Sequence, residues 1–147
     1  MPKILIIDDD VTITELLKTL VKMEGHTPTT VNDSTKAIEI AGSVDPDLIT
    51  LDLMMPGITG FELCELLHKD PRFANIPIII VSARDDPESK ERVMRAGAKD
   101  YVTKPFGADE LMQKIKELTA HRVCENSFLY ADFQHVFKII YHSLVSH

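Results

Sequence analysis

Acidic, hydroxyl and ammonium side chains follow four short apolar runs in this 147-residue chain; they are Asp8, Asp9, Asp10, Asp52, Ser82 and Lys104. Carboxylates that lie close together repel one another and attract a hard cation such as Mg²⁺. A carboxylate can also act as a nucleophile and form an aspartyl phosphate. A lysine and a hydroxyl nearby can then stabilise the phosphoryl oxygens. If the fold brings these side chains together, the sequence predicts metal-assisted phosphoryl transfer.

Each of these side chains also has an ordinary structural explanation. Asp9 or Asp10 can simply cap the helix that follows, Asp52 can be a turn residue, and Ser82 can be a helix cap. Lys104, which precedes a proline, can be a solvated surface residue. Taken singly, each structural role is the better explanation. Taken together, four independent strand ends would have to carry these residue types by chance, which favours a shared site.

The apolar runs that precede these residues are typical of buried strands. Residues 4–7, 48–51 and 76–81 are rich in Ile, Leu and Val and do not alternate with polar residues. This pattern predicts strands that are covered on both faces. Residues 27–31 and 100–103 are shorter candidate strands.

Segments with helical spacing separate the strands. The three clearest apolar stripes are Ile13, Leu16, Leu17, Leu20 and Val21, then Phe61, Cys64 and Leu67, and finally Leu111, Ile115 and Leu118. Gly25 is a stop signal after the first stripe, and Asp70-Pro71 ends the second. Two more helices are expected, one over residues 33–41 closed by Gly42 and a weaker one over residues 87–96 stopped by Gly97.

The regular alternation of strand and helix predicts an α/β fold with a mostly parallel central sheet and right-handed crossovers. Such a sheet carries its site at the carboxyl ends of the strands. All six side chains that could do chemistry lie at that edge in this arrangement.

The composition sets limits on the class of protein. A hydrophobic fraction of 44% and a charged fraction of 27% are typical of one globular domain. The net charge of −7 argues against direct DNA or RNA binding and is compatible with cations and protein partners. No run is long enough to span a membrane, and the first apolar run is too short for a signal peptide. A cytoplasmic location is therefore expected. Cys64 and Cys124 are far apart and are expected to be reduced thiols, which is favoured over a redox pair.

Four stretches resemble the receiver domain of bacterial two-component response regulators, of the chemotaxis-receiver type. They are residues 4–10 (ILIIDDD), 46–57 (PDLITLDLMMPG), 77–83 (PIIIVSA) and 96–106 (AGAKDYVTKPF). The resemblance covers roughly residues 2–120 in register. It implies a receiver domain over residues 1–120, with a flavodoxin-like, doubly wound, five-stranded parallel sheet in the order 2-1-3-4-5.

The resemblance also implies residue roles. Asp52 matches the phosphoryl acceptor, and Asp9 and Asp52 match the side-chain ligands of Mg²⁺, with Asp8 acting through a bound water. The backbone carbonyl of Met54 matches a third protein ligand. The three remaining matches are Ser82 as the hydroxyl that turns toward the phosphoryl group, Lys104 as the lysine that pairs with it, and Tyr101 as the aromatic switch residue. The Lys104–Pro105 bond is expected to be cis.

By the same resemblance, the chain is a signalling switch that receives its phosphoryl group from a histidine kinase or a phosphotransfer protein. It is an enzyme only in catalysing its own phosphorylation and dephosphorylation. The output surface is expected where the helix over 87–96, the strand over 100–103 and the last helical stripe meet. That face, or the tail described next, could form a dimer; the output partner is not specified by the sequence.

Residues 121–147 form a tail without a recognisable output domain. Its apolar residues recur at helical spacing; they are Leu129, Phe133, Val136, Phe137, Ile140 and Leu144. Three interpretations remain open: an extra helix packed on the domain, a helix for a partner or a second copy, or a segment without an evolved role. The first is slightly favoured.

Three other functions fit the residues less well. A haloacid-dehalogenase-like phosphohydrolase needs a second aspartate two residues after the nucleophile, where this chain has Met54. A flavin-binding module needs a phosphate loop after the first strand, where Asp8-Asp9-Asp10 would repel phosphate. A receiver that works without phosphorylation usually lacks one of the acids or the lysine, and all are present here.

Overall fold

The computed structural model describes residues 1–120 and 139–145. Five parallel strands form one sheet in the order β2-β1-β3-β4-β5, which confirms the expected α/β fold. The strands are β1 (Lys3–Ile7), β2 (Thr27–Val31), β3 (Leu48–Leu51), β4 (Ile78–Ser82) and β5 (Asp100–Thr103). The three central strands are almost wholly buried, as their apolar runs predict.

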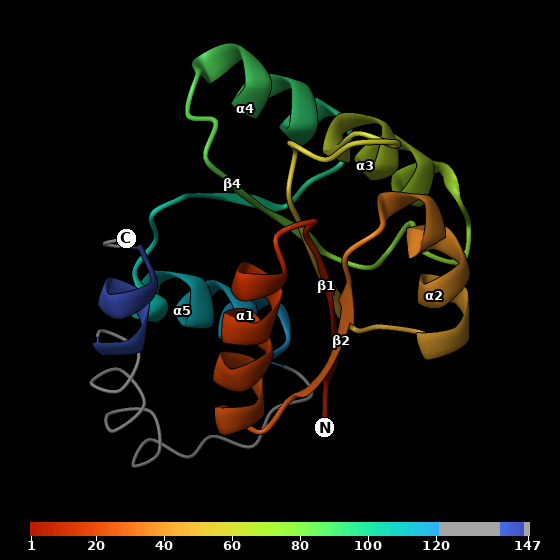
Figure 1. Cartoon of the computed structure of the whole chain (residues 1–147). Helices are drawn as coiled ribbons and strands as arrows, with labels where there is room; N and C mark the ends of the chain where they lie inside the picture. The colour runs from red at the N-terminus through yellow and green to blue at the C-terminus, as the bar shows by residue number, and fades with distance from the viewer. Residues whose placement is uncertain (121–138, 146–147) are drawn as a thin grey trace.

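Helices cover both faces of the sheet (Figure 1). They are α1 (Val11–Met23), α2 (Ala37–Val44) preceded by a short 3₁₀ turn η1 (Ser34–Lys36), α3 (Gly60–Lys69), α4 (Pro87–Arg95) and α5 (Ala108–Leu118). One core cluster joins α1 and α5 to the sheet, and the other joins α2, α3 and α4 to the opposite face. The sheet is therefore the middle layer of three.

Two predicted boundaries are wrong. Gly42 lies inside α2, and the helix continues to Val44 and ends at Asp45, whose φ of 53° is left-handed. Aspartate tolerates that conformation better than most residues, so a helix can end there without glycine. Residues 76 and 77 precede β4, because the Ile76 N–H donates to the carbonyl of Phe73 in a turn.

The helices begin at the carboxyl edge of the sheet, and side chains cap their first turns. The Asp10 carboxylate accepts hydrogen bonds from the N–H groups of Thr12 and Ile13 at the start of α1. Thr59 caps α3 in the same way, and Asp86 caps α4. Asp10 therefore has the ordinary capping role that its sequence position allowed.

Residues 139–145 are helical, which confirms a helical element in the tail for that part. The predictions for Leu129, Phe133, Val136, Phe137 and Cys124 lie outside the described residues. Within the described ranges, every helix is too short or too polar to cross a membrane.

His26, which lies between α1 and β2, should make stability depend on pH. The residue is 5% exposed, and within residues 1–120 and 139–145 its Nδ1 atom has no hydrogen-bond partner. Burial, with a smaller contribution from the N-terminal charge, lowers the pKa of His26. Protonation therefore favours the unfolded chain, so this contribution is fully present above about pH 6.5 and is lost as the pH falls through the folded-state pKa.

The expected result is a melting temperature that falls below about pH 6.5 in the wild-type protein and falls less in a His26→Leu variant. Thermal unfolding followed by circular dichroism at several pH values measures the difference. Parallel curves for the two proteins would show that His26 does not carry this dependence.

Candidate functional site

Three carboxylates meet at the carboxyl edge of the sheet. Asp8 and Asp9 follow β1, and Asp52 follows β3, which is paired with β1. The Asp52 N–H donates to the carbonyl of Ile7, so the two strand ends are held side by side. One oxygen of each carboxylate lies within 4.8 Å of the others. The sequence prediction that these acids converge is confirmed.

The buried position of Asp8 disfavours the charged form of its carboxylate. Asp8 is 2% exposed and Asp52 is 5% exposed, whereas Asp9 faces solvent. Burial raises the pKa of Asp8 to about 6, and the neighbouring charge of Asp52 acts in the same direction. Two buried carboxylates this close form a site where added positive charge is strongly favoured.

Lys104 supplies one positive charge. Its Nζ atom lies 2.7 Å from Oδ2 of Asp8 and 3.6 Å from Oδ2 of Asp52. Burial alone would lower the pKa of Lys104, but its hydrogen bond with Asp8 and the charges of both aspartates raise it above its ordinary value. The lysine is thus held in its charged form. The Lys104–Pro105 bond is cis, as expected.

Ser82 and Tyr101 approach the same loop after β4. Ser82 is the last residue of β4 and is fully buried, and its Oγ accepts a hydrogen bond from the Arg84 N–H at 3.3 Å. The Tyr101 hydroxyl donates to the carbonyl of Arg84. Burial raises the pKa of Tyr101. The two residues expected to switch together therefore both hydrogen-bond to the backbone of Arg84.

Met54 contributes through its backbone. Its N–H lies 3.4 Å from Oδ1 of Asp52, and its side chain is exposed. The exposed thioether is compatible with a role of Met54 through its backbone alone. The ligand role of its carbonyl stays a prediction.

Gly60 is a site residue that sequence reasoning missed. A Cβ atom at this position would lie 2.1 Å from the carbonyl oxygen of Asp52 and 2.5 Å from Cα of Leu53. The Gly60 N–H also donates to the carbonyl of Leu53 at 3.2 Å. The start of α3 therefore packs directly on the backbone that carries Asp52. A glycine at the first position of a helix was the only signal in the sequence, and it does not reveal which backbone it touches.

The comparisons with known proteins agree with this site. Residues 4–116 match the model of the response regulator receiver domain family. The match runs from within β1 into α5 and includes every residue of this site. The chain therefore belongs to the response regulator receiver domain family.

Among curated proteins, the chain is 39% identical over 118 residues to a DNA-binding dual master transcriptional regulator, RpaA, of Synechocystis, covering 80% of this chain and 49% of the relative. It is 33% identical over 114 residues to the DNA-binding response regulator MtrA of Mycobacterium tuberculosis, covering 78% and 49%. The chain thus spans about half the length of the curated relatives it matches.

Two solved structures show the same fold over nearly their whole length. The receiver domain of a Francisella response regulator, 1452, superposes with a TM-score of 0.76 at 35% identity, covering 84% of this chain and 100% of that chain. The chemotaxis protein CheY4 of Vibrio cholerae gives a TM-score of 0.76 at 26% identity, covering 80% and 98%.

Family membership fixes the class of activity. Receiver domains are phosphorylation switches of two-component signalling that interact with histidine kinases. The only reactions that they catalyse are the formation and hydrolysis of their own aspartyl phosphate. The acidic cluster of Asp8, Asp9 and Asp52 has the composition of a receiver metal site.

Proposed function

We propose that Asp52 is the phosphoryl acceptor of this chain and that Asp8, Asp9 and Asp52 hold Mg²⁺ for the transfer. The observation that carries the proposal is the buried pair of carboxylates, Asp8 and Asp52, which Lys104 bridges and which lies beside the exposed carboxylate of Asp9. The phosphoryl donor is a histidine kinase or a phosphotransfer protein. A cytoplasmic location is part of the proposal, and the free, buried thiol of Cys64 is compatible with it.

The donor set suits Mg²⁺ better than softer metals. All three side chains offer carboxylate oxygens, and Asp9 is exposed to solvent. This suits an ion that keeps several waters and accepts phosphate oxygens. Asp9 and Asp52 are the proposed direct ligands with the carbonyl of Met54, and Asp8 acts through a water. When bound, the ion supplies positive charge that neutralises the phosphoryl oxygens and offsets the repulsion between the carboxylates.

The transfer uses Asp52 as the nucleophile. An Oδ atom of Asp52 forms a bond to phosphorus while the bond from phosphorus to the donor breaks, and the donor leaves with that electron pair. Lys104 lies close enough to Asp52 to pair with a new phosphoryl oxygen. Ser82, at the end of the neighbouring strand β4, supplies a hydroxyl to another oxygen. These two groups stabilise charge where it develops.

Phosphorylation then changes the surface formed by α4, β5 and α5. The new group carries about 1.5 to 2 negative charges and attracts Lys104 and Ser82. Tyr101 is in contact with the Ser82 loop, and its ring lies 5.4 Å from Nζ of Lys90 in α4. A rearrangement at Ser82 therefore reaches α4 through Tyr101. The proposed change shifts an existing equilibrium between two states, and an output partner or a second copy would read it.

Intact-mass measurement after incubation with acetyl phosphate tests this function. The wild-type protein should gain one phosphoryl mass in the presence of MgCl₂ and none in the presence of EDTA. Hydroxylamine should remove the added mass, because an acyl phosphate is labile to it. No gain in a folded protein, with either acetyl phosphate or a phosphorylated histidine donor, would contradict the proposal and favour a receiver that works without phosphorylation.

Replacing Lys104 by Ala should slow phosphorylation by roughly 10²- to 10³-fold, the usual cost of removing one group that stabilises transition-state charge. In metal-free buffer the melting temperature should also fall, because Asp8 and Asp52 lose the cation between them. The time course of phosphoryl mass gain and thermal unfolding measure the two effects.

Lys114→Ala is the matched control for this prediction. Lys114 also pairs with an aspartate, Asp100 at 2.9 Å, but that pair is partly exposed and lies away from the acidic cluster. Such a pair contributes about 0–1 kcal/mol, so phosphorylation should stay near wild type. Equal rates of phosphorylation for Lys104→Ala and Lys114→Ala would show that Lys104 does not contribute to the transfer step.

The domain division also remains a proposal. We place the receiver domain at residues 1–120 and the separate tail at residues 121–147. The end of α5 at Leu118 and the end of the family match at residue 116 support this boundary.

A further inference from the structure

The helix of residues 139–145 lies against the receiver domain beside α1 and α5 (Figure 1). Ile140 and Tyr141 pack on the core cluster that those two helices form with the sheet. Among the described residues, these contacts attach the helix to the domain.

Tyr141 ties this helix to the turn that follows Lys104. The backbone N–H of Phe106 donates a hydrogen bond to the Tyr141 hydroxyl at 3.1 Å. The rings of the two residues are 5.0 Å apart at an angle of 49°, a favourable tilted arrangement. Phe106 is buried and lies only two residues after Lys104. The contact therefore joins a residue near the end of the chain to the turn that carries the site lysine.

The charge of Lys104 reaches the Tyr141 hydroxyl. Burial raises the pKa of Tyr141, while the hydrogen bond from Phe106 and the charge of Lys104 act in the opposite direction. A movement of the turn that carries Lys104 therefore changes both the hydrogen bond from Phe106 to Tyr141 and the electrostatic environment of the Tyr141 hydroxyl.

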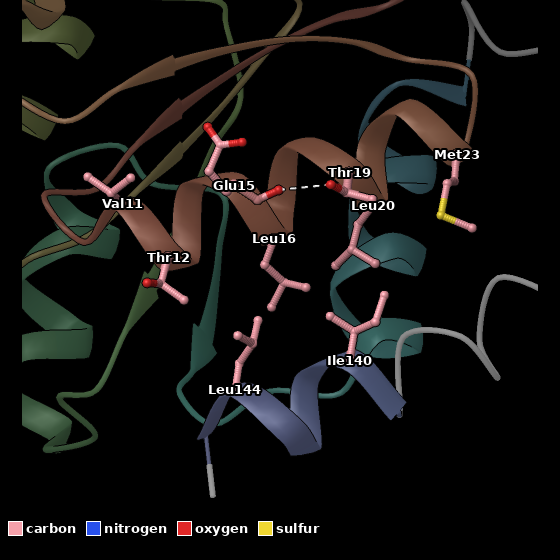
Figure 2. Close-up of a pocket in the computed structure, with 9 residues that line it drawn as sticks. All are labelled: Val11, Thr12, Glu15, Leu16, Thr19, Leu20, Met23, Ile140 and Leu144. Carbon is pink, nitrogen blue, oxygen red and sulfur yellow. Dashed lines mark hydrogen bonds between the residues drawn. The ribbon is translucent and has the colours of Figure 1, made fainter. Parts of the chain in front are cut away.

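The contact with α1 is incomplete. Figure 2 shows the side chains of Ile140 and Leu144 directed toward Leu16 and Leu20 of α1. An apolar groove with a volume of about 390 Å³ remains between the two helices. Leu144 is 44% exposed. In the part of the chain that the structure describes, Ile140 and Tyr141 are the members of this helix that pack on the domain core.

We propose that residues 139–145 are an intramolecular docking helix whose attachment is coupled to the phosphoryl-binding turn at residues 104–106. The coupling rests on the proposed function. Phosphorylation of Asp52 draws Lys104 from Asp8 toward the phosphoryl group, shifts the turn and weakens the Phe106–Tyr141 contact. By thermodynamic reciprocity, the docked helix opposes phosphorylation to the same extent. The occupant of the α1–α5 face is this segment of the same chain.

Hydrogen exchange in the unphosphorylated protein tests the docking without any phosphoryl donor. Tyr141→Phe keeps the ring and removes the oxygen that accepts from the Phe106 N–H, so exchange of that amide should become roughly 2- to 10-fold faster. Ile139→Ala is the matched control, because Ile139 lies in the same helix and is 61% exposed. Unchanged exchange in Tyr141→Phe would overturn the docking. Protection of the amide that increases with protein concentration would also overturn it, because the helix would then dock on a second copy of the chain.

Phosphorylation by acetyl phosphate and Mg²⁺ tests the coupling. Exchange at Phe106 and across residues 139–145 should increase on phosphorylation, and Tyr141→Phe should reach a several-fold higher ratio of phosphorylated to unphosphorylated protein than Ile139→Ala. Equal ratios would overturn the coupling while the docking stands. If neither protein is phosphorylated, the proposed function and the coupling both fail, whereas the exchange result without donor still decides the docking.

Discussion

An Asp52→Asn variant should gain no phosphoryl mass from acetyl phosphate and Mg²⁺, under conditions in which the wild-type protein gains one. The amide has nearly the shape of the carboxylate, but its oxygen is a poor nucleophile and carries no full negative charge. Asp52 is also one of two buried carboxylates in the acidic cluster, so the variant should bind Mg²⁺ more weakly. Intact mass and the Mg²⁺-dependent shift in melting temperature measure the two losses.

Asp45→Asn is the matched control, because it makes the same chemical change at the opposite end of β3. Asp45 is exposed and left-handed, a conformation that asparagine also adopts readily. Its phosphorylation should equal that of the wild type. A phosphoryl gain in Asp52→Asn that maps to Asp8 or Asp9 would place the acceptor elsewhere in the cluster.

The convergence of Asp8, Asp9 and Asp52 could be predicted from the sequence because it depends on local rules. Each acid follows an apolar run that is typical of a buried strand, and parallel strands place their carboxyl ends at one edge. The neighbouring positions of β1 and β3 then follow from the strand order, which the family resemblance supplied. Asp52 is 5% exposed at the end of such a strand. The amino-acid sequence with this resemblance therefore identifies Asp8, Asp9 and Asp52, whereas the capping role of Asp10 became clear only in the structure.

Contacts between distant segments could not be predicted in the same way. The 2.7 Å ion pair between Lys104 and Asp8 joins residues 96 positions apart. It depends on how the turn after β5 is positioned relative to the carboxyl edge of the sheet. The contact of Phe106 with Tyr141 depends on where the tail lies. Sequence periodicity gives the face of a helix but not the surface on which that face packs.

The helix that ends at Asp45 shows a different limit. Gly42 was a reasonable stop signal, because glycine often ends helices. In the structure the guanidinium of Arg72 and the ring of Phe73 lie near it, and α2 continues for two more residues. Tertiary packing therefore decided an end that local propensity placed too early.

The site itself is built at the expense of stability. Asp8 is buried with a pKa raised to about 6, and within residues 1–120 and 139–145 its charge is compensated by Lys104 and the backbone N–H of Asp10. A core made only for stability would not place two carboxylates there. The same buried negative charge makes the site sensitive to its surroundings. Added positive charge, or a movement of Lys104 away from Asp8, changes the electrostatic energy of the site substantially.

Gly60→Ala should destabilise the protein by about 3 kcal/mol or more, and lower its melting temperature by roughly 10 °C, although it adds a single methyl group. The added Cβ would lie 2.1 Å from the Asp52 carbonyl oxygen, 2.5 Å from Cα of Leu53 and 2.8 Å from the Asp52 carbonyl carbon. All three are backbone atoms, so no side-chain rotation relieves the clash. Either the start of α3 or the backbone of Asp52 must move.

Because the displaced backbone carries the proposed acceptor, the folded fraction of Gly60→Ala should also phosphorylate slowly. Gly42→Ala is the matched control: it lies inside α2, and its nearest neighbour at 3.0 Å is the flexible end of Arg72. Alanine favours a helix interior over glycine by about 0.5–1 kcal/mol, so this variant should be as stable as the wild type or slightly more so. Thermal unfolding and the rate of phosphoryl mass gain measure both variants. Equal melting temperatures for Gly60→Ala and Gly42→Ala would mean that α3 does not pack on the Asp52 backbone as closely as described, and the support for the acceptor would have to come from elsewhere.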